Sequence, residues 1–200
     1  YLQETVLPKY RKESGEQDIN ILAAFVEAII APDYDPDALE ILQKKKNLRI
    51  LKHEDFNPDS KFRAVDVRYV PGGMLVQQSD KASVDISDYQ VVTEQKPSDE
   101  QLKSLAFADR VAKHVKSNAI VLVKDRHIVG VGGGQMSRFD SSIIAARKAG
   151  DRARGSVLAS DAMFPARDGL DAAVKTGAVA IIQPGGSKRD QEVIDAANEH

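Results

Sequence analysis

The sequence predicts an α/β fold in which a mixed sheet lies between two layers of helices. From residue 98 to the end, helical and strand patterns alternate in the order α-β-β-α-β-α-β-α, which is typical of layered α/β proteins. The runs 119–123 and 178–182 are entirely apolar, as expected of strands buried on both faces. The hydrophobic content of 42% over 200 residues is enough for a core of this kind. We therefore expect a three-layer α/β/α unit with its ligand site at the strand ends.

The first half of the chain has a less regular pattern. Residues 19–30 carry apolar side chains at helical spacing, although the end of this segment also suits a buried strand. A helix is expected over 35–47, because Asp35 is a favourable N-cap and Pro36 suits the first helical turn. A short strand is expected to follow over 48–53.

A hairpin and a polar connection are expected next. The runs 62–70 and 73–80 read as strands joined by a Pro-Gly-Gly turn. Residues 77–97 are polar, with one strand candidate at 89–95, and are the best candidate for a linker or surface excursion.

The second half carries clear start and stop signals. Ser98 with Gln101, and Ser137 with Asp140, have the spacing of capping boxes, and Gly177 stops a short helix. The expected helices cover 98–118, 138–150, 168–177 and 188–200, and the expected strands cover 119–125, 127–133, 156–164 and 178–184.

Four glycines within five positions follow an apolar run: Gly130, Gly132, Gly133 and Gly134. A dinucleotide fingerprint needs a third glycine where Gln135 stands, and a phosphate-binding P-loop needs a Gly-Lys-Ser/Thr ending that is absent. Two interpretations remain. Bare backbone before a helix start favours an anion or electron-rich ligand near Ser137 and Arg138, or the glycines form a tight turn.

Composition excludes several function classes. Lys and Arg number 28 against 30 Asp and Glu, so the net charge of −2 gives no reason to expect nucleic acid or a membrane surface as partner. The lack of Cys excludes disulfides, thiolate metal sites and Cys nucleophiles, and fits the cytoplasmic location that we predict. No apolar run approaches the ~18 residues of a membrane span. The first residue is not Met, so we expect a partial chain.

Six stretches in sequence order carry a resemblance to one family: 25–51, 69–80, 114–125, 129–138, 155–173 and 180–200. They resemble AICAR transformylase, the C-terminal formyltransferase part of the bifunctional purine-synthesis enzyme that also contains IMP cyclohydrolase. The resemblance implies two cytidine-deaminase-like units without zinc, and the deaminase zinc signature is absent here. On this basis residues 1–97 complete or link a preceding unit, and residues 98–200 form the folate-side unit.

The resemblance also implies roles for individual residues. Asn118 matches an Asn that contacts the substrate carboxamide and the transferring formyl group. Asp161 and Ser117 match positions where some members hold a monovalent cation, so K+ is a candidate ligand. The positions that match folate neighbours in the family are Ser137, Arg138, Phe164, Pro165, Asp168 and Ser187.

These residue types suit formyl transfer from 10-formyltetrahydrofolate to the amine of AICAR. An amide such as Asn118 can orient the reactants and stabilise a developing oxyanion without titrating. A carboxylate such as Asp168 can accept two hydrogen bonds from the amino-pterin edge of a folate. Family sites form across a dimer interface, so the resemblance implies a homodimer.

The sequence also departs from the family. The catalytic Lys-His pair has a surrounding motif that neither 52–53 nor 113–114 carries, so we predict that the 200-residue chain alone is inactive. Met163 stands where the family usually has Phe, and Ala166 stands where it often has a second Phe. Both differences change the wall of the pterin site. Two other functions stay open: a non-catalytic deaminase-like module for folate or nucleotide binding or for assembly, and a phosphate-binding α/β enzyme suggested by the glycines alone.

Overall fold

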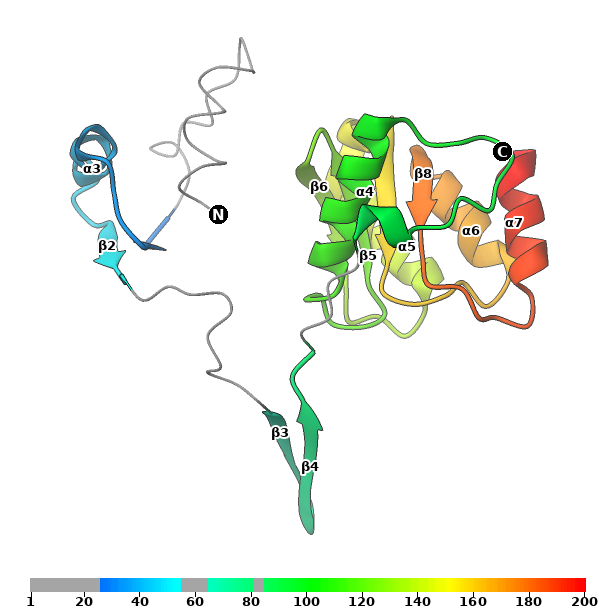
Figure 1. Cartoon of the computed structure of the whole chain (residues 1–200), viewed down its shortest axis with the longest axis horizontal. Coiled ribbons are helices and arrows are strands. Elements are labelled where there is room, and N and C mark those ends of the chain that lie inside the picture. The colour runs from blue at the N-terminus through cyan, green and yellow to red at the C-terminus, as the bar shows by residue number, and fades with distance from the viewer. Residues whose placement is uncertain (1–25, 55–64, 81–84) are drawn as a thin grey trace. The chain divides into compact units, whose positions relative to one another are not determined.

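The computed structural model describes residues 26–54, 65–80 and 85–200. The chain divides into two units, Tyr1–Asp80 and Lys81–His200, and the second contains the alternating elements (Figure 1). The proposed roles of residues 1–97 and 98–200 in a deaminase-like pair stay predictions. Within the described part of the chain, no helix has the length and apolar character that a membrane crossing requires.

The first described segment is a small β-α-β unit. Strands β1 (Ala28–Ala31) and β2 (Arg49–Lys52) pair in parallel, with helix α3 (Pro36–Gln43) between them. The strand alternative for the end of 19–30 is therefore correct where that segment is described, but the strand is not buried, since Ile30 is 47% exposed. Residues 19–25 lie outside the described residues. Asp35 is the N-cap residue of α3, as predicted, although its side chain makes no capping hydrogen bond.

The predicted hairpin is present. Strands β3 (Val65–Val70) and β4 (Gly73–Gln78) pair antiparallel around a turn in which Gly72 has a φ of +87°. The strand candidate at 89–95 is wrong. No strand forms there, and the backbone N–H of Glu94 donates to the Asn198 side chain.

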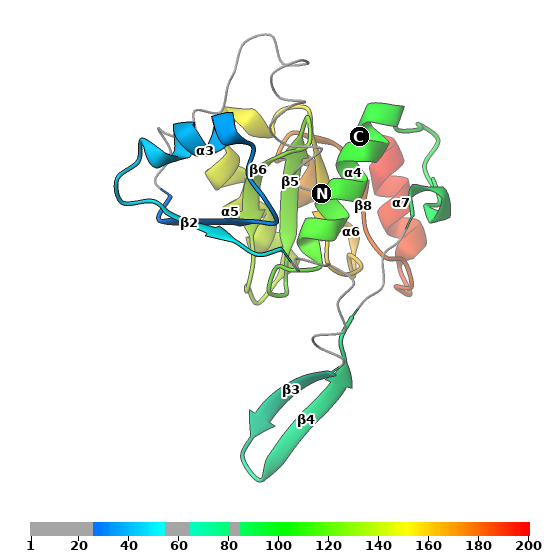
Figure 2. The ribbon, with the colours of Figure 1, turned by 60° about the vertical axis from the view of Figure 1, so that its left-hand side comes forward.

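The second unit is built around one four-stranded sheet, with strand order β6-β5-β7-β8 (Figure 2). β5 runs antiparallel to both β6 and β7, whereas β7 and β8 are parallel, so the sheet is mixed as predicted. In chain order its elements are η1 (Ile86–Asp88), α4 (Asp99–Ala112), β5 (Ile120–Lys124), β6 (His127–Gly132), α5 (Arg138–Ala149), η2 (Gly150–Ala153), β7 (Ser156–Ser160), α6 (Arg167–Val174), β8 (Ala178–Ile182) and α7 (Asp190–Glu199).

Helices cover both faces of this sheet, which confirms the three-layer α/β/α arrangement. On one face, Leu105, Ala108 and Ala112 of α4 pack against the Val121 side of the sheet. On the other face, α5, α6 and α7 enclose a second apolar cluster with Ile120, Leu122 and Leu158 among its buried members. The apolar side chains of β5 therefore point alternately to the two faces of the sheet and pack in two separate cores.

Helix α4 begins with the predicted capping box. The Ser98 hydroxyl accepts from the Gln101 N–H, and the Gln101 side chain accepts from the Ser98 N–H. Ser137 likewise caps α5 through the N–H of Asp140. These local signals placed the starts of both helices correctly.

The strand order brings four chain segments to one end of the sheet. Ile120 at the start of β5 pairs with Gly132 at the end of β6 and with Ser160 at the end of β7. Because β8 runs parallel to β7, its end lies at the same side. We call this end, with the connections 117–119, 133–138, 161–168 and 183–187, the site edge.

Candidate functional site

Asn118 occupies the connection that leads into β5, and its side chain is half-buried. Its backbone N–H and its Nδ2 both donate to the carbonyl oxygen of Gln135, at 3.2 and 2.9 Å. Its own carbonyl accepts from the Ser141 Oγ at 2.8 Å, and the Ser117–Asn118 peptide bond is cis. These contacts direct the amide nitrogen toward the glycine loop and leave Oδ1 available as an acceptor.

Arg138 begins α5 and reaches across to the end of β7. Its Nε donates to Ser160 Oγ and to the carbonyl of Ala162, each at 3.2 Å, and its Nη2 lies 3.3 Å from Asp161 Oδ1. The side chains of Arg138 and Asp161 are only 15% and 13% exposed. Of the guanidinium nitrogens, Nη1 is therefore the one left for a ligand.

Ser137 uses its hydroxyl locally. Oγ accepts from the Asp140 N–H at 3.1 Å and lies 2.7 Å from Asp140 Oδ2, to which it donates. This arrangement satisfies one of the free amides of the first turn of α5. A contact between Ser137 and a folate stays a prediction.

The glycine run is explained largely by helix packing. A Cβ on Gly132 would lie 2.0 Å from the carbonyl oxygen of Ser141, and one on Gly130 would lie 2.2 Å from that of Ala145. Helix α5 thus occupies the space beside these two glycines, so its packing accounts for their lack of a side chain. Gly134, with a φ of +69°, forms the turn and donates its N–H to Lys116 O.

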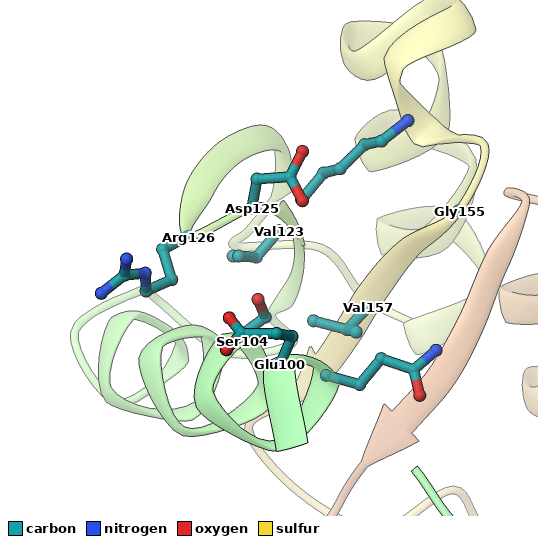
Figure 3. Close-up of a pocket in the computed structure, with 9 residues that line it drawn as sticks. Glu100, Ser104, Val123, Asp125, Arg126, Gly155 and Val157 are labelled. Carbon is teal, nitrogen blue, oxygen red and sulfur yellow. The ribbon is translucent and has the colours of Figure 1, made fainter. Parts of the chain in front are cut away.

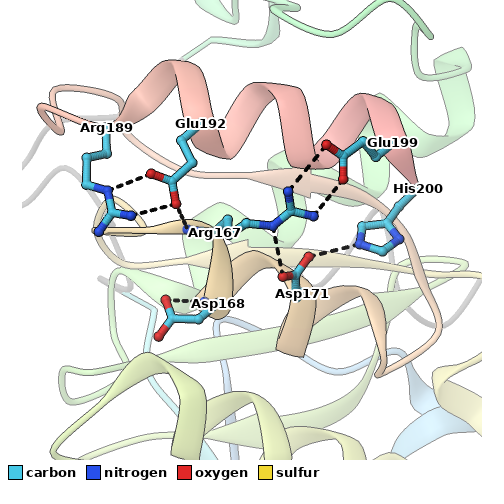
Figure 4. Close-up of polar contacts among 8 residues, drawn as sticks. Arg167, Asp168, Asp171, Arg189, Glu192, Glu199 and His200 are labelled. Atoms are coloured by element: carbon cyan, nitrogen blue, oxygen red, sulfur yellow. Dashed lines mark hydrogen bonds and ion pairs between the residues drawn. The ribbon is translucent and has the colours of Figure 1, made fainter.

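Asp168 lies in the first turn of α6 and is exposed. Ala166 is the N-cap residue of this helix, and no side chain caps it. The Asp168 Oδ1 accepts from the N–H of Gly169 at 2.8 Å, which leaves Oδ2 available (Figure 4). An exposed carboxylate of this kind can accept two hydrogen bonds from a planar donor pair.

An ionic network fixes the helix that carries Asp168. Arg167 bridges from α6 to α7, with Asp171 Oδ2 at 3.2 Å and Glu199 Oε2 at 2.6 Å (Figure 4). The hydrogen bond from Arg167 lowers the pKa of Glu199, and those from His200 and Arg167 lower the pKa of Asp171. Glu199 and His200 are exposed and Arg167 and Asp171 are partly exposed, so the network orients α6 more than it stabilises the fold.

The other predicted folate neighbours lie after β7 and β8. Phe164 is fully buried in the core beside Gly169, and its N–H donates to the Gln183 side chain. Ser187 Oγ lies 3.4 Å from the carbonyl oxygen of Pro165, to which it donates. Met163, next to Phe164, is 40% exposed and presents its side chain to solvent.

The site edge therefore collects every predicted site residue, in two groups. Asn118, Ser137, Arg138 and Asp161 lie around the starts of β5 and α5. Ser141 Oγ donates to the carbonyls of Asn118 and Ser137, and Asp161 accepts from Arg138 and from Ala119, which follows Asn118. Phe164, Pro165, Asp168 and Ser187 form the second group around the start of α6. The 161–168 connection joins the groups. The roles of these residues toward a ligand stay predictions.

The K+ prediction concerns Ser117 and Asp161. Asp161 Oδ1 already accepts from the Ala119 N–H at 2.9 Å and faces the Arg138 guanidinium, which balances its charge. A cation would have to use Oδ2 and compete with that guanidinium, so these two residues alone are a poor K+ site. Among the described residues no three His, Cys, Asp or Glu side chains are placed to hold a metal ion.

Sequence patterns gave no sign of three supporting residues. Asn118 is held by the backbone carbonyl of Gln135 and by the hydroxyl of Ser141. Arg138 is held by the hydroxyl of Ser160. Ser141 is fully buried in α5, and this burial is a property of the folded chain that the spacing of residues does not show.

A cavity of about 190 Å³ lies at the opposite end of the sheet, near the β5–β6 turn (Figure 3). Its lining residues are Glu100, Gln101, Ser104, Val123, Lys124, Asp125, Arg126, Gly155 and Val157. None of the predicted site residues contributes to it.

Comparison with known proteins decides the family. A sequence profile described as AICARFT/IMPCHase bienzyme matches residues 13–148. The chain belongs to the AICARFT/IMPCHase bienzyme family. The bifunctional purine biosynthesis protein PurH of Magnetococcus marinus is 50% identical over 190 residues, which cover 90% of this chain and 36% of that protein. PurH of Brucella ovis is 52% identical over 199 residues, covering 94% of this chain and 36% of the relative.

The chain thus spans about a third of the length of the curated relatives that it matches. The AICARFT/IMPCHase profile includes Asn118, Ser137 and Arg138 but ends at residue 148, before the Asp161–Asp168 connection. The similarity to the two PurH proteins extends over most of the chain. The expected family resemblance is confirmed.

Proposed function

We propose that this chain is the folate-side part of an AICAR formyltransferase. The parent protein would move a formyl group from 10-formyltetrahydrofolate to AICAR in purine biosynthesis, as a homodimer with a composite site. The observation that carries this proposal is membership of the AICARFT/IMPCHase bienzyme family, with 50% identity to a PurH protein over 90% of the chain.

The site edge supports the proposal through the polar atoms it presents. Asn118 offers Oδ1, because its Nδ2 is held by Gln135 O. This oxygen can accept a hydrogen bond from the AICAR amine and orient its lone pair toward the formyl carbon. Asp168 offers an exposed carboxylate on a fixed helix, which suits the paired N–H donors of an amino-pterin.

The reaction needs balanced proton movement. The amine nitrogen attacks the formyl carbon, and the bond from that carbon to the folate nitrogen breaks as the tetrahedral intermediate collapses. The amine loses one proton and the departing folate nitrogen gains one. A base with a pKa near neutrality suits the first transfer, and we assign it to a Lys-His pair outside these 200 residues.

The two Lys-His pairs within the chain have other environments. Lys52 forms ion pairs with Asp33 and Glu54 at 3.1 and 3.2 Å. His114 is exposed after the end of α4. This supports the proposal that the 200-residue chain alone does not transfer formyl groups, and it equally favours a non-catalytic folate-binding or assembly module as the second candidate.

Formyl transfer by the full-length gene product tests the proposal. The purified protein is mixed with AICAR and 10-formyltetrahydrofolate, and tetrahydrofolate release is followed by absorbance. We expect turnover by the full-length protein and none by residues 1–200. No turnover by the full-length protein, despite folate binding, would favour the non-catalytic module. Turnover by the 200-residue chain would refute its assignment as an incomplete site.

A further inference from the structure

The structure assigns to Asp161 a positioning role at the site edge: one carboxylate oxygen holds Arg138 and the Asn118–Ala119 backbone in a single arrangement. This inference rests on the proposed formyl transfer and deepens it. It treats Asp161 as a residue that acts through Arg138 and Asn118 and that need not touch a substrate itself.

The contacts of Asp161 carry the inference. Its Oδ1 accepts from the backbone N–H of Ala119 at 2.9 Å and lies 3.3 Å from Nη2 of Arg138. Its own N–H donates to the carbonyl of Ala119 at 3.3 Å. Asp161 therefore extends the β5–β7 pairing by one residue and reaches α5 at the same time.

Arg138 depends on this carboxylate for its direction. Its Nε contacts at Ser160 and Ala162 are to neutral acceptors, so Asp161 is its one ion-pair partner among the described residues. Both side chains of the pair are nearly buried, where a charge without a partner is costly. The carboxylate thus keeps the guanidinium against β7, with Nη1 as the nitrogen left for a ligand.

Asn118 depends on Asp161 through the backbone. Ala119 is fully buried and directly follows Asn118, so the Ala119 N–H bond to Asp161 fixes the peptide on one side of the Asn118 side chain. Gln135 O fixes the amide nitrogen on the other side. Loss of the Asp161 acceptor would free the Ala119 end of this arrangement.

Two substitutions separate the two effects. Asp161→Asn keeps an oxygen for the Ala119 N–H but removes the negative charge that faces Arg138. Asp161→Ala removes both. We expect Asp161→Asn to raise the KM for the folate on the order of tenfold with little change in the KM for AICAR. We expect Asp161→Ala to raise both KM values and to lower kcat as well.

A double-mutant cycle in the full-length protein gives the decisive test. The folate KM is measured for Asp161→Asn, for Arg138→Gln and for the variant that carries both substitutions. If Asp161 acts through Arg138, the Asn substitution adds almost nothing once Arg138 is replaced. A purely structural role would give the same loss in both backgrounds, and that result would overturn the inference.

A matched control uses Asp125→Asn at the opposite end of the sheet. Asp125 has a φ of 51°, a conformation that Asn tolerates well, so this substitution removes one negative charge without backbone strain. We expect its KM values and kcat to equal those of the wild type. If Asp125→Asn raised the folate KM as much as Asp161→Asn, general charge and not position would explain the effect, and the inference would fail.

Wild-type protein that neither transfers formyl groups nor binds folate would overturn the proposed function and the inference together. Active wild-type protein with additive effects of Asp161→Asn and Arg138→Gln would leave formyl transfer intact and overturn the positioning role alone.

Discussion

Replacing Gly132 by Ala should open the contact between β6 and α5. The added Cβ would lie 2.0 Å from the carbonyl oxygen of Ser141 and 2.8 Å from its carbonyl carbon. Both neighbours are helix backbone and cannot rotate away. The oxygen would have to move by about 1 Å to reach the 3.0 Å that real Cβ contacts respect. Helix α5 or strand β6 must therefore shift.

Two opposing terms set the size of the effect. Overpacking of a core costs about 1–3 kcal/mol. Replacing Gly by Ala restricts the unfolded chain and returns about 0.4–1 kcal/mol where the backbone conformation is compatible. At the upper end of the overpacking cost, the free energy of opening the β6–α5 region should fall by about 2 kcal/mol. This change corresponds to about 30-fold faster hydrogen exchange if exchange follows opening of this region.

Hydrogen exchange followed by mass spectrometry of peptides from 127–149 measures this change in the full-length protein. Gly73→Ala is the matched control, because a Cβ there meets nothing within 4 Å. Since Ser141 also bonds the Asn118 carbonyl, formyl transfer should fall together with the protection. Unchanged exchange in Gly132→Ala would refute the reasoning, because it would mean that α5 does not lie this close to β6.

Three further predictions concern single side chains. Asp168→Ala should weaken folate binding in the full-length protein about tenfold, measured by calorimetry, and equal affinity would contradict its assignment. Asn118→Ala should lower kcat on the order of 100-fold with folate affinity largely kept, because the acceptor that orients the amine is lost, and steady-state kinetics can check this. Burial, with Asp109 beside it, raises the pKa of Tyr89 to about 12. The unfolded chain releases this proton near pH 10, so stability should fall as pH rises from about 10 to about 12, and Tyr89→Phe should remove that slope in denaturant titrations.

The pattern of local signals predicted much of the second unit. Capping residues such as Ser98 and Ser137 act within one helical turn, so their effect can be read from spacing alone. The apolar run 119–123 correctly marked β5 as a buried strand, because burial on both faces demands apolar side chains at every position. The apolar run 178–182 was misleading, because β8 is an edge strand of the sheet and Val179 is 58% exposed. The strand expected over 156–164 ends earlier, at Ser160, where the chain turns to join the site edge.

What the sequence by itself determined is the fold class, the starts of the main helices and the family. Only the tertiary structure decided which connections meet. The Asp161–Arg138 pair joins residues 23 positions apart, and Asp161 reaches Ala119 across 42 positions. The packing of α5 on Gly130 and Gly132 likewise depends on how strand and helix cross. Such contacts depend on strand order and helix position, which no spacing of neighbouring residues records, because the chain segments involved become neighbours only when the sheet forms.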